Sequence, residues 1–380
     1  MALTLSSIAD LARLDVDEII DVRSPSEYAD DHVPGAISLP VLDDAERARV
    51  GTIYKQVSPF TARKLGAALV ARNAAAHLEG PLADRPGGWR PLVYCWRGGQ
   101  RSGSFATILA QIGWRVETLQ GGYKSWRGLV VEAVHQRPVP APVVLLDGNT
   151  GSAKTELLAL LAARGVQVID LEGMARHRGS LFGATGPQPG QRAFEGQLAL
   201  ALARLDPARP VVIEAESSTI GSCRLPPPLW KAMCAAPRIA LAAPAAERAR
   251  YLTRAYADLC EGGQGDAAPG GGRLAATLDR LRPYHAADLI RAWQAMAAAG
   301  QFTALAQALM ERHYDPRYAR HRGRLAVPVL DCPAPSLAEA ALPDLADRVA
   351  ALVGPAAGQA RAAAALSAGA SGGRQDSRLG

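Results

Sequence analysis

Cysteine is scarce in this sequence and follows no regular spacing. The five cysteines stand at positions 95, 223, 234, 260 and 332, and no two of them form a Cys-x-x-Cys pair. This spacing argues against a disulfide framework and against a zinc site, and it is typical of a protein kept in a reducing compartment. We therefore expect no bound metal.

Long apolar runs are also missing. No stretch reaches the about 20 apolar residues that a membrane-spanning helix needs. Met1-Ala2-Leu3-Thr4 begins without the basic and apolar regions of a signal peptide. With 48% hydrophobic and 21% charged residues, the composition is that of a globular protein. We expect a cytoplasmic location and no membrane partner.

Length and charge limit the remaining classes. A chain of 380 residues is too long for one ordinary core, so two domains are expected. The net charge of +6 and the pI of about 9.2 permit an anionic partner such as nucleic acid. An arginine-rich surface without a specific partner would give the same balance, so charge alone does not decide.

Strands alternate with helices in both halves of the chain, which predicts an α/β fold with parallel sheets. A proline-rich linker over residues 137–142 separates a domain over 1–136 from a second α/β domain over 143–353 with a helical C-terminal part. The expected strands cover 18–22, 91–94, 114–119, 143–147, 166–170, 210–215 and 237–243, and the expected helices include 60–77, 102–112, 123–134 and 156–163. Residues 261–272 read as a glycine-rich mobile loop, and 354–380 as a disordered tail.

A short loop between the strand 91–94 and the helix 102–112 contains a cysteine at its mouth. Its sequence is Cys95-Trp96-Arg97-Gly98-Gly99-Gln100-Arg101. Such a loop turns successive N–H groups inward and adds the positive end of a helix dipole, which stabilises a thiolate. We interpret Cys95 as a reactive thiol flanked by the positive charges of Arg97 and Arg101. The alternative is a buried structural cysteine at a strand end.

A second loop has a phosphate-binding pattern. Gly148-Asn149-Thr150-Gly151-Ser152-Ala153-Lys154-Thr155 follows a strand and precedes a helix, as in a P-loop. The amides of Gly148, Gly151 and Ser152 would cradle a diphosphate, Lys154 would reach the terminal phosphate, and the Thr155 hydroxyl would face any Mg²⁺. Nothing in the sequence requires that Mg²⁺. Ala153 stands where the pattern has glycine, and we expect it to fit if its φ is negative.

Charged residues follow the next two strands of the second half. Asp170 and Glu172 close one strand, and Glu214 and Glu216 close the next. These carboxylates could hold a metal or activate water, although solvated strand ends would look similar. His177 and Arg178 lie in a basic loop over 175–183 that suits contact with RNA, as would a plain surface loop.

Several motifs together resemble a known family. The first half resembles a rhodanese module, and its combination with a P-loop domain resembles the tRNA 2-selenouridine synthase family over residues 5–350. The motifs are Asp21-Val22-Arg23-Ser24-Pro25-Ser26-Glu27-Tyr28, His32-Val33-Pro34-Gly35-Ala36-Ile37, the Cys95 loop, Gly121-Gly122-Tyr123-Lys124-Ser125-Trp126, residues 148–155, His177-Arg178-Gly179-Ser180, Glu214-Ala215-Glu216-Ser217, Ile220-Gly221 and His313-Tyr314-Asp315-Pro316.

This resemblance implies a transferase that acts on the wobble 2-thiouridine of tRNA. Such an enzyme transfers a geranyl group from geranyl diphosphate to the sulfur and then replaces the geranylated sulfur with selenium from selenophosphate. It implies no tightly bound cofactor and a protein that supplies selenophosphate. Cys95 would carry selenium as a selanyl-cysteine. The phosphate part of the donor would lie against Arg97, Arg101 and the loop of Trp96, Gly98 and Gly99, and Tyr314 and Tyr318 could stack on the anticodon base.

Three other interpretations stay open. The first is a persulfide-carrying sulfurtransferase that acts on RNA, with a regulatory nucleotide-binding domain. The second is a phosphatase, because Cys95 and Arg101 have the spacing of a Cys-x₅-Arg loop, although Tyr94 stands where histidine is frequent. The third is an RNA-binding scaffold without activity.

We expect His32 to pack in a turn.

Overall fold

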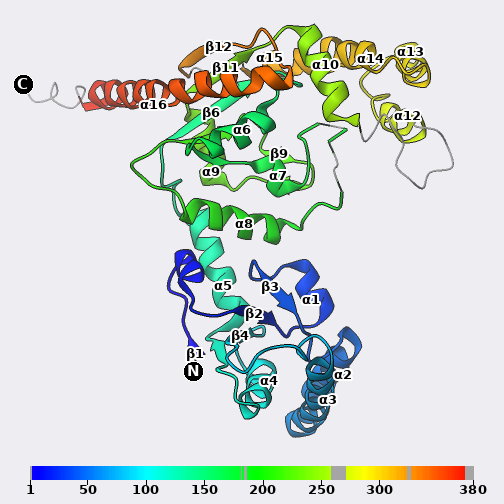
Figure 1. Ribbon diagram of the computed structural model, residues 1–380, viewed down its shortest axis with the longest axis vertical. Helices are drawn as coiled ribbons and strands as arrows, with labels where there is room; N and C mark the ends of the chain where they lie inside the picture. The colour runs from blue at the N-terminus through cyan, green and yellow to red at the C-terminus, as the bar shows by residue number, and fades with distance from the viewer. Residues whose placement is uncertain (1, 181, 184–185, 258–270, 323–326, 373–380) are drawn as a thin grey trace, which may run out of the picture. The chain divides into compact units, whose positions relative to one another are not determined.

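The computed structural model describes residues 2–180, 182–183, 186–257, 271–322 and 327–372 (Figure 1). The chain forms two compact units. The first unit consists of Met1–Pro138, Pro189–Arg204 and Ser222–Pro228, and the second of Val139–Gln188, Leu205–Gly221 and Leu229–Gly380.

This division differs from the single boundary expected at residues 137–142, because a segment from the second half belongs to the first unit. Helix α8 (Gln191–Ala203) packs against η1 (Ile8–Arg13), α5 (Gly122–Val131) and the π-helix η2 (Glu132–Gln136). Glu195 of α8 forms ion pairs with Arg127 and His135. These contacts join sequence-distant residues, which a boundary read from local composition does not detect.

The first unit is built on a five-stranded parallel sheet of order β1-β5-β4-β2-β3. Ile20 and Val93 point to one face of this sheet, where they share a core with Leu69 and Phe105. Side chains alternate along a strand, so Asp21 and Tyr94 point to the opposite face. The elements are β1 (Ala2–Leu3), β2 (Glu18–Asp21), α1 (Pro25–Asp30), β3 (Ala36–Ser38), α2 (Asp44–Gln56), α3 (Pro59–Glu79), β4 (Pro91–Tyr94), α4 (Gln100–Gln111), β5 (Glu117–Leu119) and β10 (Cys223–Arg224), besides those above.

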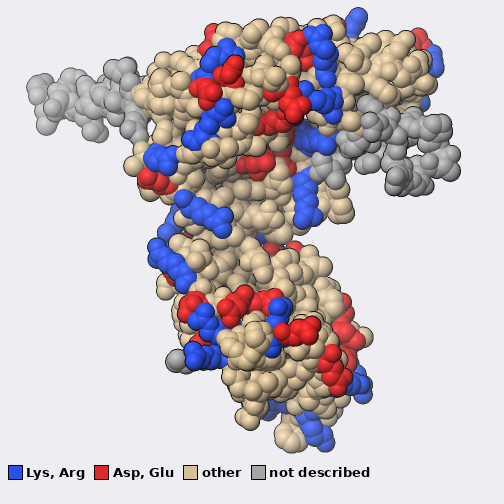
Figure 2. Space-filling view, viewed as in Figure 1, with Lys and Arg blue, Asp and Glu red and all other residues tan. Residues whose placement is uncertain are grey.

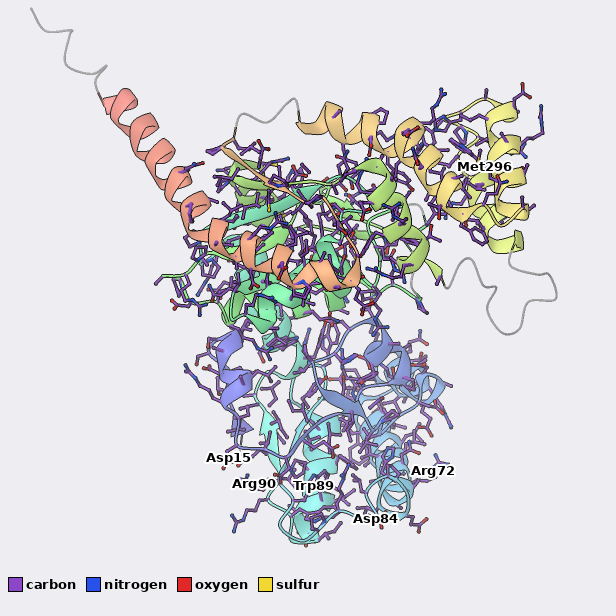
Figure 3. All side chains as sticks on the ribbon, turned by 45° about the horizontal axis from the view of Figure 1, so that its top comes forward. Asp15, Arg72, Asp84, Trp89, Arg90 and Met296 are labelled. Carbon is purple, nitrogen blue, oxygen red and sulfur yellow. The ribbon has the colours of Figure 1, made fainter. Side chains whose placement is uncertain are left out.

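The amino-terminal end of β4 is held by ion pairs and by two tryptophan rings in edge-to-face contact. Asp15, Trp89 and Arg90 are labelled close together in Figure 3. The Arg90 guanidinium donates to an Asp15 carboxylate oxygen at 2.7 Å, and the Trp89 and Trp114 rings meet edge to face at 5.0 Å. These contacts fix the strand at the end opposite to Cys95.

The second unit is built on a parallel sheet of order β12-β11-β6-β8-β7. The strands of this unit and the helices that connect them are β6 (Val143–Gly148), α6 (Lys154–Ala163), β7 (Gln167–Ile169), α7 (Leu171–Ala175), β8 (Val211–Glu214), β9 (Thr219–Ile220), α9 (Pro227–Ala235), β11 (Arg238–Ala242), α10 (Ala245–Ala255) and β12 (Val329–Pro333). Further helices of the unit are described below. Both sheets are parallel and flanked by helices, which confirms the predicted fold class. Strand β12 was not expected from the sequence.

The helices between α10 and β12 form a separate packed group within the second unit. They are α12 (Gly271–Asp279), α13 (Ala287–Ala298), α14 (Phe302–Leu309), the π-helix η3 (Met310–Tyr314) and α15 (Asp315–Arg322). Trp293 and Leu278 are buried at the centre of a cluster contributed by α12, α13 and α14. The loop expected over 261–272 lies almost wholly outside the described residues, which resume at 271.

The structure shows a helix over most of the segment that the sequence predicted to be a disordered tail. After η4 (Glu339–Ala341), α16 runs from Leu342 to Gly372 and includes Pro355. Figure 1 shows it lying along the second sheet and then projecting beyond it. Ala356 and Ala357 are buried against the core. Alanine has the highest helix propensity, and this outweighs the breaks that Gly354 and Pro355 suggest. Residues 373–380 lie outside the described part.

Among the described residues, no helix is long and apolar enough to cross a membrane.

We predict that Ala356→Asp lowers the free energy of unfolding by at least about 2 kcal/mol, because it buries a carboxylate without a partner. Gln359→Asp adds the same side chain to an exposed position on the same helix and should change little. Denaturant unfolding followed by circular dichroism checks this. Equal effects of the two variants would contradict the docking of residues 354–359.

Candidate functional site

The Cys95 loop is held in place by close contact between two backbone turns. Gly98 has a φ of 64°, and a Cβ atom there would lie 2.4 Å from the carbonyl oxygen of Leu119. A Cβ atom on Gly122 would lie 2.2 Å from the carbonyl oxygen of Cys95. That same oxygen accepts a hydrogen bond from the Tyr123 amide at 2.9 Å. Only glycine allows this approach, so the loop is rigidly positioned.

The sulfur of Cys95 accepts two hydrogen bonds. The Gly99 amide donates to Sγ at 3.3 Å and the Ser102 hydroxyl donates at 3.2 Å, while the residue is only 4% exposed. Burial acts to raise the pKa of the Cys95 thiol, but these hydrogen bonds and the nearby charge of Arg101 outweigh it and lower the pKa. The arrangement therefore favours the thiolate. Sequence reasoning missed Ser102, although its place in the first turn of α4 was a usable signal.

The two arginines of the loop have different surroundings. Arg101 donates to Glu27 at 2.8 Å, and Glu27 also accepts from Arg47 at 2.9 Å. Burial acts to raise the pKa of Glu27, but its hydrogen bond and ion pair with Arg101 bring it down to about 2. The Arg97 side chain is exposed and forms no hydrogen bond or ion pair with any residue in the described ranges. Of the two, Arg97 is the one free to bind an incoming anion.

Trp96 lies over the aromatic residue that supports the loop. Its ring is 37% exposed and lies 5.3 Å from that of Tyr123. This position fits a residue that lines the approach to the thiol. His32 stacks on Tyr28 at 3.9 Å and bonds its carbonyl oxygen through Nδ1, as expected of a turn-packing residue.

A buried polar network lies beneath the Cys95 loop. The guanidinium of Arg23, a residue that is only 1% exposed, donates to both carboxylate oxygens of Asp21 and lies 4.0 Å from the Tyr123 ring. The Tyr94 hydroxyl donates to Asp21 at 2.7 Å, and the Tyr123 hydroxyl donates to Asp31 at 2.6 Å. Because Tyr123 also bonds the carbonyl of Cys95, this network fixes the loop from below. The sequence indicated Asp21 and Arg23 only through the family motif.

In the second unit, the loop between β6 and α6 has P-loop geometry with one deviation. A Cβ atom on Gly148 would lie 2.3 Å from Ser152 Oγ, and Gly151 has a φ of 83°. Ala153 has a φ of 59°, so the condition under which we expected alanine to fit, a negative φ, is not met. Its methyl group is buried in the core with Leu157, and this burial offsets the strain of the left-handed conformation.

Several polar groups of this loop point toward one cavity. Lys154 Nζ donates to the Gly148 carbonyl at 3.0 Å, and the Thr155 hydroxyl donates to Glu172 at 2.9 Å. The buried Ser152 Oγ and Asn149 Oδ1 have no hydrogen-bond partner among the described residues. Unpartnered buried polar atoms are rare in folded proteins, and here they suit a loop that receives a polar ligand.

The four predicted carboxylates separate into two pairs. Glu172 and Glu216 line the same cavity of about 290 Å³ as Lys154, Thr155 and Arg178. Burial and their mutual repulsion raise the pKa of Glu216 above its usual range, and burial raises that of Glu172. Hydrogen bonding to Glu172 adds to the rise in the pKa of Glu216.

The other predicted residues have structural positions. Glu214 is 1% exposed and accepts from the Glu172 amide, and burial raises its pKa well above the usual range. Asp170 caps α7 through the Gly173 amide at 2.7 Å. The buried Nδ1 of His177 has no hydrogen-bond partner in the described ranges, and burial lowers the pKa of this residue. No three His, Cys, Asp or Glu residues in these ranges are grouped as a metal site.

An apolar cavity adjoins the P-loop cavity. The two share Thr150, Ser180, Leu252, Tyr256 and Tyr314 in their walls. The whole apolar cavity has a volume of about 80 Å³, and its other lining residues are Phe182, Thr253, Leu274, Phe302, Leu305, Ala306, Leu309 and Met310. Sequence reasoning missed this cavity because α10, α14 and η3, which line most of it, are far from the P-loop in sequence.

Both halves of the chain match known protein families. A family model described as a rhodanese-like domain matches residues 6–129, and one described as the tRNA 2-selenouridine synthase AAA domain matches residues 141–270. A tRNA 2-selenouridine synthase from Ectopseudomonas mendocina is 35% identical over 80% of this chain and 87% of its own length. Those from Aeromonas salmonicida and Pseudomonas syringae pv. syringae are 39% and 34% identical, over 65% and 80% of this chain and 67% and 88% of their own lengths.

A solved structure that covers much of this chain is similar to it only at a low level. A thiosulfate sulfurtransferase from Pseudomonas aeruginosa is 15% identical, with 67% of this chain and 50% of that chain covered at a TM-score of 0.19. That likeness carries no argument.

We predict that Ser102→Ala raises the pKa of the Cys95 thiol by about one unit, because the thiolate loses about 1.4 kcal/mol of hydrogen-bond stabilisation. At a pH below the thiol pKa, Cys95 alkylation should slow about tenfold. Peptide-resolved mass spectrometry of iodoacetamide labelling against pH separates Cys95 from the other cysteines. Ser104→Ala, an exposed position on the same helix, should leave the profile unchanged.

Proposed function

Because the chain belongs to the tRNA 2-selenouridine synthase family, we propose that it modifies the wobble 2-thiouridine of tRNA in two steps. In the first step, a geranyl group moves from geranyl diphosphate to the sulfur of the base. In the second, selenium from selenophosphate replaces the geranylated sulfur, with Cys95 as the selanyl carrier.

The geranyl step is supported chiefly by the apolar cavity that shares its wall with the P-loop cavity. A prenyl diphosphate has a charged head and an apolar chain, and it needs two adjoining sites of these two kinds. The loop amides and Lys154 suit the diphosphate, whose negative charge grows as the bond to carbon breaks. Phe302, Leu305 and Leu309 suit the chain.

The selenium step is supported by the state of Cys95. Its hydrogen bonds from Gly99 and Ser102 favour the thiolate, and a thiolate is a soft nucleophile suited to selenium and sulfur. The exposed Arg97 is in a position to bind the phosphate of a donor, together with the amides around Gly98 and Gly99. Arg101 acts mainly through its charge, because Glu27 occupies its guanidinium.

The partners follow from this chemistry. The substrate is tRNA, and a protein that supplies selenophosphate is required. On the face drawn in Figure 2, acidic and basic side chains are interspersed on each unit, so no single basic block marks the RNA surface there. We propose a cytoplasmic enzyme without a tightly bound cofactor.

The central test follows the wobble base by mass spectrometry. 2-Thiouridine tRNA is incubated with geranyl diphosphate and then with selenophosphate. We expect Lys154→Ala to fail at geranylation, whereas Cys95→Ala should stop at the geranylated product. Lys231→Ala and Cys332→Ala remove the same side chains elsewhere in the second unit and should act like the wild type. Sulfur transfer to tRNA without any prenyl donor would instead support a persulfide sulfurtransferase.

A second prediction concerns the apolar cavity alone. Ala306→Phe should fill the cavity and weaken binding of geranyl diphosphate at least about tenfold, a loss of about 1.4 kcal/mol. Binding of inorganic diphosphate should not change, because the P-loop is untouched. Ala304→Phe places the same ring on the exposed side of α14 and is the control. Isothermal titration calorimetry with both ligands measures this, and equal losses for both would contradict the assignment of the chain to this cavity.

A further inference from the structure

A third cavity in the second unit has no role in the function proposed so far. It has a volume of about 250 Å³ and shares Gly179, Glu216 and Tyr318 with the P-loop cavity. Glu216 therefore stands in the wall between the two. Trp230 and Met233 of α9 also line the third cavity.

The walls of this cavity suit a planar ring. Trp230 and Tyr318 provide aromatic faces, and Met233 provides a polarisable apolar contact. Unstacked bases of single-stranded RNA are bound in this way, between aromatic side chains with polar groups at the ring edge.

The charges of the cavity are arranged unevenly. Arg238 and Asp147 are both buried and paired at 2.9 Å, so they neutralise each other. Arg317 bonds His313 and lies 4.5 Å from the Tyr284 ring, and it supplies a positive charge at the cavity wall. A positive charge beside an aromatic slot suits the phosphate that accompanies a nucleotide.

Glu216 is held in place by the loop that crosses it. Gly179 has a φ of 63°, and a Cβ atom there would lie 2.5 Å from an oxygen of Glu172 and 2.8 Å from one of Glu216. The loop backbone therefore lies directly on both carboxyl groups. A side chain at residue 179 would separate them from the cavities that they line.

Alkylation of a 2-thiouracil ring releases a proton. As the sulfur forms its bond to C1 of the prenyl group, the C1–O bond breaks and its electrons leave with the diphosphate. The thione becomes a thioether, C2 and N3 form a double bond, and N3 loses its hydrogen. A base must take that proton. Glu216 lines the cavity, and its raised pKa makes its carboxylate a stronger base than that of an ordinary glutamate.

From these observations, and resting on the proposed geranyl transfer, we propose that the third cavity binds the 2-thiouracil base and that Glu216 accepts its N3 proton. Trp230 and Tyr318 hold the ring, and Arg317 binds an adjacent RNA phosphate. Lys154 and the P-loop amides bind the leaving group on the other side of Glu216.

Photocrosslinking tests the cavity without any prenyl transfer. An anticodon stem-loop with 5-iodouridine at the wobble position is irradiated with the full-length protein, and the adduct is mapped by mass spectrometry. We expect the adduct on Trp230 or Tyr318. An adduct confined to other residues would overturn the base site, even if geranylation proceeds normally.

Kinetics test the role of Glu216. In single turnovers with saturating RNA and geranyl diphosphate, Glu216→Gln should lower the alkylation rate at least about a hundredfold. Its crosslinking yield and its affinity for geranyl diphosphate should stay unchanged, which a merely structural loss would not allow. Trp230→Ala should raise the KM for RNA, Trp230→Phe should restore it, and Glu311→Gln on the exposed surface is the charge control.

The outcomes separate the two levels of the proposal. If the wild type does not alkylate 2-thiouridine with geranyl diphosphate, the proposed function fails. If the wild type does so and Glu216→Gln keeps its rate, only the assignment of the proton acceptor fails.

Discussion

Both sites depend on one constraint of parallel sheets, the sharp turn between a strand and the following helix. In such a turn, unpaired amides and the positive end of the helix dipole point to the same place. Near Cys95, contact between the turns at Gly98 and Gly122 fixes the thiol. In the second unit, Gly148 lies against the side chain of Ser152. Close packing at glycine thus shapes each loop before any ligand binds.

The two sites shift the pKa values of their acidic groups in opposite directions. At Cys95, hydrogen bonds and a nearby guanidinium lower the thiol pKa despite burial, so the site already stabilises an anion. Beside Lys154, burial raises the pKa of both Glu172 and Glu216, and the charge of Glu172 raises that of Glu216 further. The proposed diphosphate would add negative charge beside these carboxyl groups, which Lys154 and the loop amides would have to offset. The first site thus lowers the pKa of its reactive group, whereas the second raises the pKa values of its carboxyl groups.

The sequence predicted what is local and missed what is distant. The strand, loop and helix around Cys95 and around Lys154 were predicted because a few adjacent residues define such turns. Glu27 was missed because it meets Arg101 from 74 residues away. Ala153 was misjudged because the cost of a left-handed φ, about 1 kcal/mol, is matched by about 0.8 kcal/mol from its buried methyl group. Local sequence shows that cost but not the compensating core.

The proposed chemistry also explains why the thiol and the P-loop belong to different units. A thiolate is a stronger nucleophile than the thione sulfur of a base, so Cys95 in contact with a prenyl diphosphate would be alkylated and lost as a carrier. The cavity beside Lys154 avoids this: Cys234 lines the adjoining cavity, and burial raises rather than lowers the pKa of that thiol. Burial thus disfavours the thiolate at Cys234, near the proposed donor, whereas hydrogen bonds favour it at Cys95, as such a two-step transfer requires.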